Sequence, residues 1–171
     1  MNQMTQTTQA DSTLLVQEQS NQYLTFLVSK ESYAIRIIDV KEIIEMSSVT
    51  RVPMTPDYIH GVINLRGSVV PVVDLSARLG KGCTEISKRS CIILVEIELV
   101  DSVQLIGMLV DEVKEILDIA LENIQSAPDF GSEIRTDFIQ AMGRVDDHFI
   151  ILLAINRVLS VDELSQLQQL T

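Results

Sequence analysis

The chain has 171 residues, of which 24 are acidic and 13 basic, so its formal net charge is −11. Hydrophobic residues make up 46% of the chain, too many for a disordered protein and enough for one domain or two small subdomains. The acidic balance argues against binding to nucleic acid or an anionic membrane, and 2 His and 2 Cys leave little for nucleophilic or metal chemistry.

The N-terminal residues, 1–21, are rich in Gln, Thr and Ser and predict a flexible leader. They lack the basic start and the apolar stretch of a signal peptide. No segment reaches the roughly 18–20 apolar residues of a membrane span. Cys83 and Cys91 are too few for a disulfide framework, so free thiols in a cytoplasmic protein are expected.

The body of the chain opens with two apolar runs, 24–28 and 33–38, which predict a β-hairpin. Asp39 and Glu42 then have the spacing of a capping box. The apolar residues that follow would share one helical face: Val40, Ile43 and Ile44. The sequence therefore predicts a short helix over 40–44.

A second strand pair, 61–65 and 68–73, is predicted on the two sides of a tight turn at 66–67. Asp74 then has the position of an N-cap for a one-turn helix over 75–79. Gly80 follows it directly, as expected of a residue that ends a helix.

The second half of the chain repeats this order of elements. Strands are predicted over 91–97 and 105–110. Segment 113–117 then echoes 40–44, and two further segments follow at a slightly larger offset: 137–139 echoes 57–59, and 149–159 echoes 69–79. Three echoes in the same order indicate an internal duplication.

The duplication predicts an all-β fold, because each half is a small set of strands with a short helix. About 75 residues of β-structure bury too little surface to be stable alone. Closing each sheet into a barrel removes its edges, and packing two barrels together supplies the missing burial and leaves a groove between them. We expect one domain over 22–159, with intertwined subdomains of roughly 22–85 and 86–159.

A C-terminal helix is predicted over 160–171. Ser160 and Glu163 have capping-box spacing. Its apolar stripe is expected to dock on the body through Val161, Leu164 and Leu167.

Catalytic motifs are absent from the sequence: it has no Gly-rich phosphate loop and no nucleophile elbow. His60 and the Asp146-Asp147 pair are most simply explained as structural and turn residues. Arg66 is more informative, because an Arg at a tight turn needs an acidic mate or a protein partner. Glu42 is the predicted mate, and both a bracing role and a protein-binding role remain open. Phe130, between Pro, Asp and Gly, is either tucked back or offered to a partner.

Several segments together give the chain a family resemblance: 33–35, 40–43, 49–53, 59–67 and 69–75 in the first half, and 107–113 and 149–153 in the second. Through them the chain resembles the CheW chemotaxis coupling proteins over 22–159. The block that runs from Asn64-Leu65-Arg66-Gly67 to Pro71-Val72-Val73-Asp74-Leu75 is specific in combination, whereas the flanking apolar strands are not.

This resemblance implies a non-enzymatic adaptor with two five-stranded SH3-like barrels, no cofactor and no metal. Its partners would be the cytoplasmic tips of chemoreceptors, the regulatory domain of a CheA-type histidine kinase and other CheW-like adaptors in rings at the inner membrane. The implied partner-binding residues are Val40, Glu42, Ile43, Gly61, Asn64, Arg66 and Val113, on or near the groove, and Asp129 and Phe130, facing the kinase or a neighbouring adaptor.

The chain departs from the family pattern at two positions. Ser76 stands where many members have Arg, and Ala154 stands where many have Asp. An adaptor of a sister pathway, for pili or surface sensing, is therefore the alternative; a small-ligand binder or enzyme on the same fold would need a polar pocket that the sequence does not indicate. Arg66→Ala and Gly61→Asp are both expected to weaken partner binding without unfolding the protein.

Overall fold

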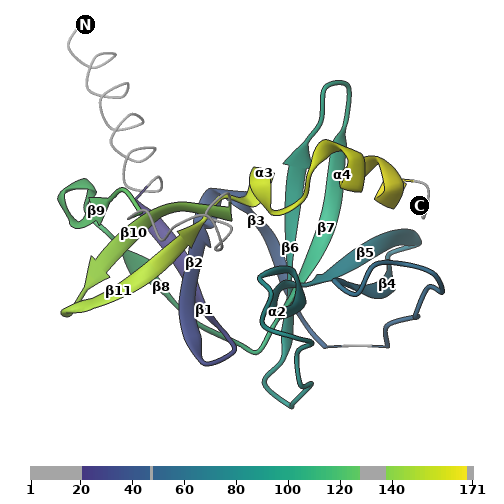
Figure 1. Ribbon diagram of the computed structural model, residues 1–171, viewed down its shortest axis with the longest axis horizontal. Coiled ribbons are helices and arrows are strands. Elements are labelled where there is room, and N and C mark those ends of the chain that lie inside the picture. Colours follow the sequence, from purple (N-terminus) through teal and green to yellow (C-terminus); the bar gives the residue numbers. More distant parts are fainter. Residues whose placement is uncertain (1–20, 47, 128–137, 169–171) are drawn as a thin grey trace, which may run out of the picture.

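The computed structural model describes residues 21–46, 48–127 and 138–168. Inside the C-terminal helix it describes no side chain for Val161, Asp162 and Gln168. Residues 1–20 of the predicted leader lie outside the described residues, as do Asp129 and Phe130. Two small sheets lie side by side, with short helices above and between them (Figure 1).

The first sheet has the strand order β8-β1-β2-β11-β10-β9. Its strands are β1 (Gln22–Val28), β2 (Glu31–Arg36), β8 (Glu112–Asp118), β9 (Ile124–Gln125), β10 (Ile139–Val145) and β11 (His148–Leu153). The outer strands β8 and β9 follow each other in the chain, joined through the 3-10 turn η2 (Leu121–Asn123). The chain thus runs directly from one outer strand of the sheet to the other, and we call this sheet the first barrel.

The second sheet has the order β3-β6-β7-β5-β4 and forms the second barrel. Its strands are β3 (Val40–Glu45), β4 (Ile59–Leu65), β5 (Ser68–Asp74), β6 (Cys91–Glu98) and β7 (Val103–Val110). The segment that follows β3 reaches β4 through an isolated bridge, in which Thr50 and Val62 exchange two backbone hydrogen bonds of 2.9 Å. The remaining elements are the 3-10 turn η1 (Ile37–Asp39) and the helices α2 (Leu75–Arg78), α3 (Ile155–Val158) and α4 (Val161–Gln168).

Each barrel combines strands from both halves of the chain. The first half contributes β1 and β2 to the first barrel, and β3, β4 and β5 to the second. The second half contributes β6 and β7 to the second barrel and its later strands to the first. The halves 22–85 and 86–159 are therefore not the two barrels: each half gives its first hairpin to one barrel and its other strands to the other.

The duplication is visible in the strand pairing. Parallel pairs join the halves within each barrel, with Leu152 opposite Ala34 in one and Val72 opposite Gly107 in the other. The two pairs are counterparts in the sequence repeat. The offset that relates 40–44 to 113–117 also relates Ala34 to Gly107, and the offset that relates 69–79 to 149–159 also relates Val72 to Leu152. The antiparallel pairs β4–β5 and β10–β11 also contain a register shift at matching positions. It lies between Ile59 and Gly61 in β4, and between Ile139 and Ala141 in β10.

The short helix predicted over 40–44 is wrong, because this segment is strand β3 and only η1 before it is helical. A register shift between Val40 and Glu42 explains the misleading pattern. It puts Val40 opposite Val95 and Ile43 opposite Ile93, so residues three apart share one face of a strand. Val and Ile are also β-branched, which favours strands over helices.

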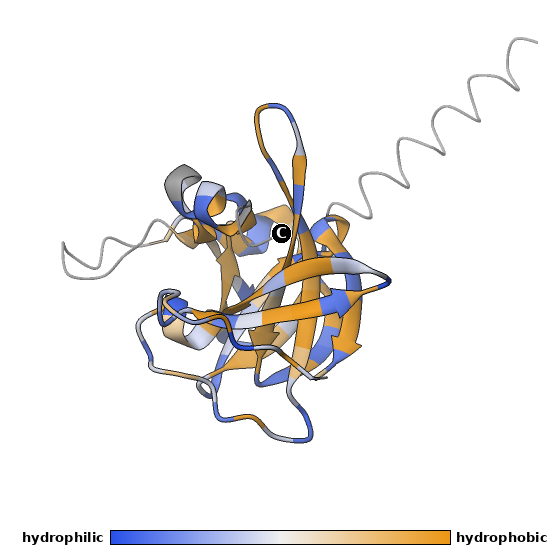
Figure 2. Cartoon of the chain, turned by 90° about the vertical axis from the view of Figure 1, so that its right-hand side faces the viewer, coloured by the Kyte–Doolittle hydropathy of each residue, from blue (hydrophilic) through white to orange (hydrophobic). Residues whose placement is uncertain are grey.

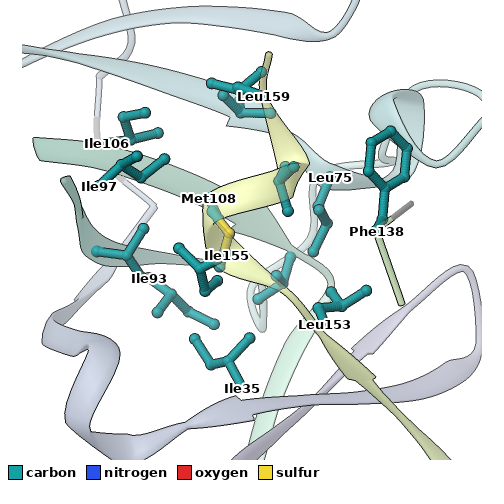
Figure 3. Close-up of a cluster of buried hydrophobic side chains, with 14 of the residues drawn as sticks. Ile35, Leu75, Ile93, Ile97, Ile106, Met108, Phe138, Leu153, Ile155 and Leu159 are labelled. Atoms are coloured by element: carbon teal, nitrogen blue, oxygen red, sulfur yellow. The ribbon is translucent and has the colours of Figure 1, made fainter. Parts of the chain in front are cut away.

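Most of the core lies between the barrels rather than inside them. Counted over the described residues, a cluster inside the second barrel has 6 buried members and a cluster inside the first barrel has 5. The cluster between the barrels, which we call the seam, has 21. Figure 3 shows Ile35 and Leu153 of the first barrel facing the same core as Ile93 and Met108 of the second. Because small barrels bury little surface alone, the seam is what stabilises both.

The hydropathy of the residues differs between the strands and the loops that connect them. The strands are largely hydrophobic with hydrophilic residues between, whereas the connecting loops mix hydrophilic, intermediate and hydrophobic residues (Figure 2). Among the described residues, none of the helices has the length and apolar character needed to cross a membrane.

The C-terminal helix α4 begins with the predicted capping box. The Ser160 amide donates to Glu163 Oε1 over 2.8 Å, and the Glu163 amide donates to Ser160 Oγ over 3.2 Å. Leu164 and Leu167 are buried in the seam, so docking of the helix on the body is confirmed for these two residues. The third residue of the predicted stripe, Val161, lies outside the described side chains.

Candidate partner-binding site

Two of the predicted binding residues, Val40 and Val113, occupy matching places in the two barrels. Val40 begins β3 of the second barrel, and Val113 lies near the start of β8 in the first. They open the echoing segments 40–44 and 113–117, so they are counterparts in the duplication. Both are partly buried and pack against the seam. The structure therefore places them where the apolar layer between the barrels approaches the surface.

Ile43 extends this apolar surface along β3. It pairs with Ile93, which is buried in the seam, and residues paired across two strands lie on the same face of the sheet. Ile43 nevertheless remains 42% exposed, because β3 is an outer strand of its sheet.

Ile116 is the counterpart of Ile43 on β8, at the same offset that relates Val113 to Val40. It pairs with Leu24 of the seam and is 52% exposed. The sequence reasoning missed this residue, although the offset that links Val40 to Val113 would have found it. We call Val40, Ile43, Val113 and Ile116 together the seam rim.

The predicted ion pair between Glu42 and Arg66 is confirmed. Arg66 Nη2 lies 2.9 Å from both carboxylate oxygens of Glu42. It links β3 to the β4–β5 turn, so it spans the outer strands of the second barrel beside the Thr50–Val62 bridge. The side chains are 72% and 37% exposed, and such a pair contributes at most about 1 kcal/mol to stability. The ion pair therefore contributes more to the orientation of the exposed Arg66 guanidinium group than to the stability of the fold. This is compatible with a role of Arg66 in binding.

Asn64 holds the turn that carries Arg66. Its Oδ1 accepts a hydrogen bond of 2.9 Å from the Gly67 amide. Arg66 and Gly67 both have positive φ, 51° and 87°, as in the two-residue turns that match the twist of a hairpin. Asn64 is exposed but acts on the backbone, so its direct contribution is to place Arg66.

Gly61 is buried and lies under the segment that closes the second barrel. A Cβ atom there would lie 2.4 Å from the Thr50 carbonyl oxygen and 2.6 Å from Val49 Cγ1. The expectation that Gly61→Asp leaves the fold intact is therefore wrong, because any side chain collides with this backbone. Gly61 supports the site by admitting the Val49–Thr50 segment, and it has no side chain with which to contact a partner.

The remaining candidates do not form a catalytic centre in the described part of the chain. His60 is half-buried on β4, where burial and the positive charge of Arg51 lower its pKa. Asp146 and Asp147 occupy the β10–β11 turn, as predicted, with positive φ at both residues. Within the described ranges no group of three or more His, Cys, Asp or Glu side chains is placed to hold a metal ion.

Comparison with known proteins places the chain in a family. The model of the CheW-like domain family matches residues 22–163. The chain is 31% identical over 144 residues to the chemotaxis protein CheW of Klebsiella aerogenes, covering 84% of each chain. It is 34% identical over 140 residues to that of Rhizobium meliloti, covering 82% of this chain and 88% of the relative.

A solved structure agrees with the sequence comparison. The crystal structure of the scaffolding protein TtCheW from Thermoanaerobacter tengcongensis superposes with a TM-score of 0.74 at 35% identity, covering 84% of this chain and 90% of that one. The all-β fold of two SH3-like barrels, expected from the resemblance, is confirmed by this similarity, although the first sheet has six strands rather than the expected five. With sequence, family model and fold in agreement over most of its length, the chain belongs to the CheW-like domain family.

Proposed function

We propose that this protein is a non-enzymatic adaptor that couples chemoreceptors to a CheA-type histidine kinase in bacterial chemotaxis. The observation that carries this proposal is the family match over 22–163, joined to an apolar seam rim that both barrels share. The relatives are named chemotaxis proteins, and the solved neighbour is described as a scaffolding protein. These names favour chemotaxis over a sister pathway for pili or surface sensing.

The receptor tip is proposed to bind at the seam rim. A helical hairpin offers apolar side chains at helical spacing, which pack on an apolar surface that has polar residues beside it. Ile43 and Ile116 provide exposed apolar area on β3 and β8, and Glu42 and Arg66 provide charge beside Ile43. Arg66 has both a positive charge and an exposed side chain, which suits an acidic or carbonyl group of the receptor.

The kinase is proposed to bind elsewhere, at the end of a barrel, so that both partners are held at once. Asp129 and Phe130 remain the candidates for contact with its regulatory domain or with a neighbouring adaptor. Modest interfaces of this kind gain affinity when many copies assemble in one array. Receptor signalling would then bias the kinase through contacts that differ between its states.

Co-sedimentation tests the proposal directly. Receptor cytoplasmic fragments assembled on vesicles should pull down the wild-type protein, and should pull down the kinase only when the protein is present. Arg66→Ala should reduce the sedimented fraction, whereas Arg144→Ala, which removes a similar exposed ion pair with Asp147 in the first barrel, should not. A wild-type protein that stays in the supernatant with and without kinase would refute the proposed function.

A further inference from the structure

Among the described residues, Arg78 at the end of α2 has the most buried basic side chain of any ion pair. Its side chain is 9% exposed, whereas the other ion-paired Arg and Lys side chains are 27% to 77% exposed. Its Nε donates to the Val158 carbonyl oxygen over 2.7 Å, and its Nη2 donates to Glu163 Oε1 over 2.8 Å. One guanidinium group therefore holds the end of α3 and the first turn of α4.

Two aromatic rings lie against the same guanidinium. Its Cζ is 4.7 Å from the centre of the Tyr58 ring and 4.9 Å from that of Phe138. Both distances are within the range of cation–π attraction, and the planar group suits stacking between rings. Tyr58 and Phe138 are the middle residues of the echoing segments 57–59 and 137–139, so they are counterparts in the duplication. The Asp74 amide donates to the Tyr58 carbonyl oxygen over 2.7 Å, and the Ala154 amide donates to that of Phe138 over 2.8 Å.

These contacts join the two barrels. Tyr58 precedes β4 of the second barrel, and α2 follows β5 of the same barrel. Phe138 precedes β10 of the first barrel, and Val158 ends α3, which follows β11 there. The duplication gives Arg78 no charged counterpart, because Val158 itself stands at the corresponding position of the second half. A single Arg of one barrel is thus bound by one ring and one carbonyl of the other.

The same contacts border the seam. Phe138, Val158 and Leu164 belong to the buried cluster of the seam, and Tyr58 packs against it. Val40 and Val113 of the seam rim pack against that cluster too. A shift of one barrel against the other at Arg78 would therefore also shift the two strands that carry the seam rim.

We propose that Arg78 is a positioning residue that fixes the orientation of the two barrels and thereby the geometry of the seam rim. The receptor part of this inference rests on the proposed function, whereas the orientation part does not. Apolar contacts in the seam hold the barrels together but are not directional. The contacts of the guanidinium group are directional. Two rings set the orientation of its plane, and one carbonyl and one carboxylate set the orientation of its N–H donors.

The orientation is measured by the distance between two spin labels. Leu121→Cys labels the first barrel at η2, and Val69→Cys labels β5 of the second; both positions are exposed. Cys83 and Cys91 are replaced by Ser so that no other thiol reacts. Electron–electron double resonance should give a narrow distance distribution for the parent protein and a clearly broader or shifted one for Arg78→Met.

Three further variants separate the possible causes. Arg78→Lys keeps the charge without the planar fork, and an intermediate broadening is expected; it is also the test variant if Arg78→Met does not fold. Arg144→Met removes an exposed Arg that pairs within one barrel, and should leave the distribution unchanged. Glu163→Gln removes the negative charge at α4 but keeps an oxygen acceptor and all contacts of Arg78 between the barrels, and should also leave the distribution unchanged. Unaltered distances in Arg78→Met and Arg78→Lys, or equal broadening in Glu163→Gln, would overturn the proposal.

Binding supplies a second readout. Arg78→Met should raise the Kd for a receptor hairpin fragment about tenfold, while the Kd for the kinase regulatory domain stays within about twofold. Equal loss of both affinities would point to general destabilisation and would count against a positioning role. If the unsubstituted protein binds neither partner, the proposed function fails, and the label distances still decide the role of Arg78.

Discussion

Truncation of the two exposed isoleucines of the seam rim should weaken receptor binding while the protein still folds. Ile43→Ala and Ile116→Ala remove apolar area from the same place on the two barrels. Both side chains are about half exposed, at 42% and 52%. Each variant therefore removes about as much apolar contact from the free protein as a helical partner would cover, so the effect on stability is measured separately from the effect on binding.

The size of the effect follows from the exposed area. Complete burial of an Ile side chain is worth about 1.5–3 kcal/mol, so covering the exposed part of Ile43 or Ile116 is worth about 0.6–1.5 kcal/mol. Alanine keeps one methyl group, and the double variant should lose about 1–2 kcal/mol of binding free energy. That loss corresponds to an increase in Kd of roughly five- to thirtyfold.

Fluorescence anisotropy with a labelled receptor hairpin fragment measures this change. Ile86→Ala is the matched control, because Ile86 is 48% exposed and lies in the α2–β6 connection, outside the seam cluster. Urea denaturation of all variants checks that the fold is retained. A double variant that binds within about twofold of the parent protein, or an Ile86→Ala variant that is equally weakened, would refute the assignment of the receptor to the seam rim.

Three further outcomes are expected. Arg66→Ala should change the free energy of unfolding by less than about 1 kcal/mol in urea while lowering receptor co-sedimentation. Gly61→Ala should lower the free energy of unfolding by about 1–3 kcal/mol in the same measurement, because its Cβ meets the Thr50 backbone. Gly143→Ala should cost less, because its Cβ would meet side-chain atoms alone, the nearest being Ile119 Cδ1 at 3.1 Å. Finally, the Glu163 contribution to stability should be complete above its ordinary pKa of 4.5 and be lost as the pH falls through its lower folded value, which NMR shifts of the α4 amides would follow.

The depressed pKa of Glu163 has several causes. Burial alone would raise this pKa, but hydrogen bonds from Ser160 and Tyr58 and the charge of Arg78 outweigh the effect of burial. The same contact acts on Tyr58 in the opposite direction: burial, followed by the hydrogen bond and the charge of Glu163, raises the pKa of Tyr58 to about 12. Since both groups keep their ordinary protonation at neutral pH, the junction at α4 is stable there and weakens only in acid.

Local chemistry in the sequence predicted much of the fold. The Ser160–Glu163 capping box, the Asp74 cap and the turn at 66–67 were predictable because each depends on residues a few positions apart. The Glu42–Arg66 pair was predictable because a charged residue at an apolar hairpin requires a mate. The structure of segment 40–44 was not predictable in this way. Its register shift arises where β3 pairs with β6, and the shift gives the apolar residues of a strand the spacing expected of a helix.

The exchange of strands between the halves was hidden from the sequence for a different reason. Repeated segments reveal which parts of a chain are alike, but the pairing of β2 with β11 and of β5 with β7 is set by packing over long separations. Arg78 was hidden likewise, since Tyr58, Phe138 and Glu163 meet only when both barrels are assembled. The repeats do show which residues of the two halves occupy equivalent positions. Once Ile43 is known, they identify Ile116 as its equivalent.

The exchange of strands has a consequence for coupling. The strands β3 and β8, which carry the seam rim, are hydrogen-bonded to β6 and β1, and the faces of β6 and β1 form the seam itself. A partner that presses on the rim is thus one strand away from the layer that joins the barrels. The chain crosses between the barrels at two short connections, η1 between β2 and β3 and Asp111 between β7 and β8, and these limit how far the barrels can move apart. A partner bound at the rim would therefore favour the barrel orientation that we propose Arg78 to hold, because binding energy can select only an arrangement with which the partner makes better contacts.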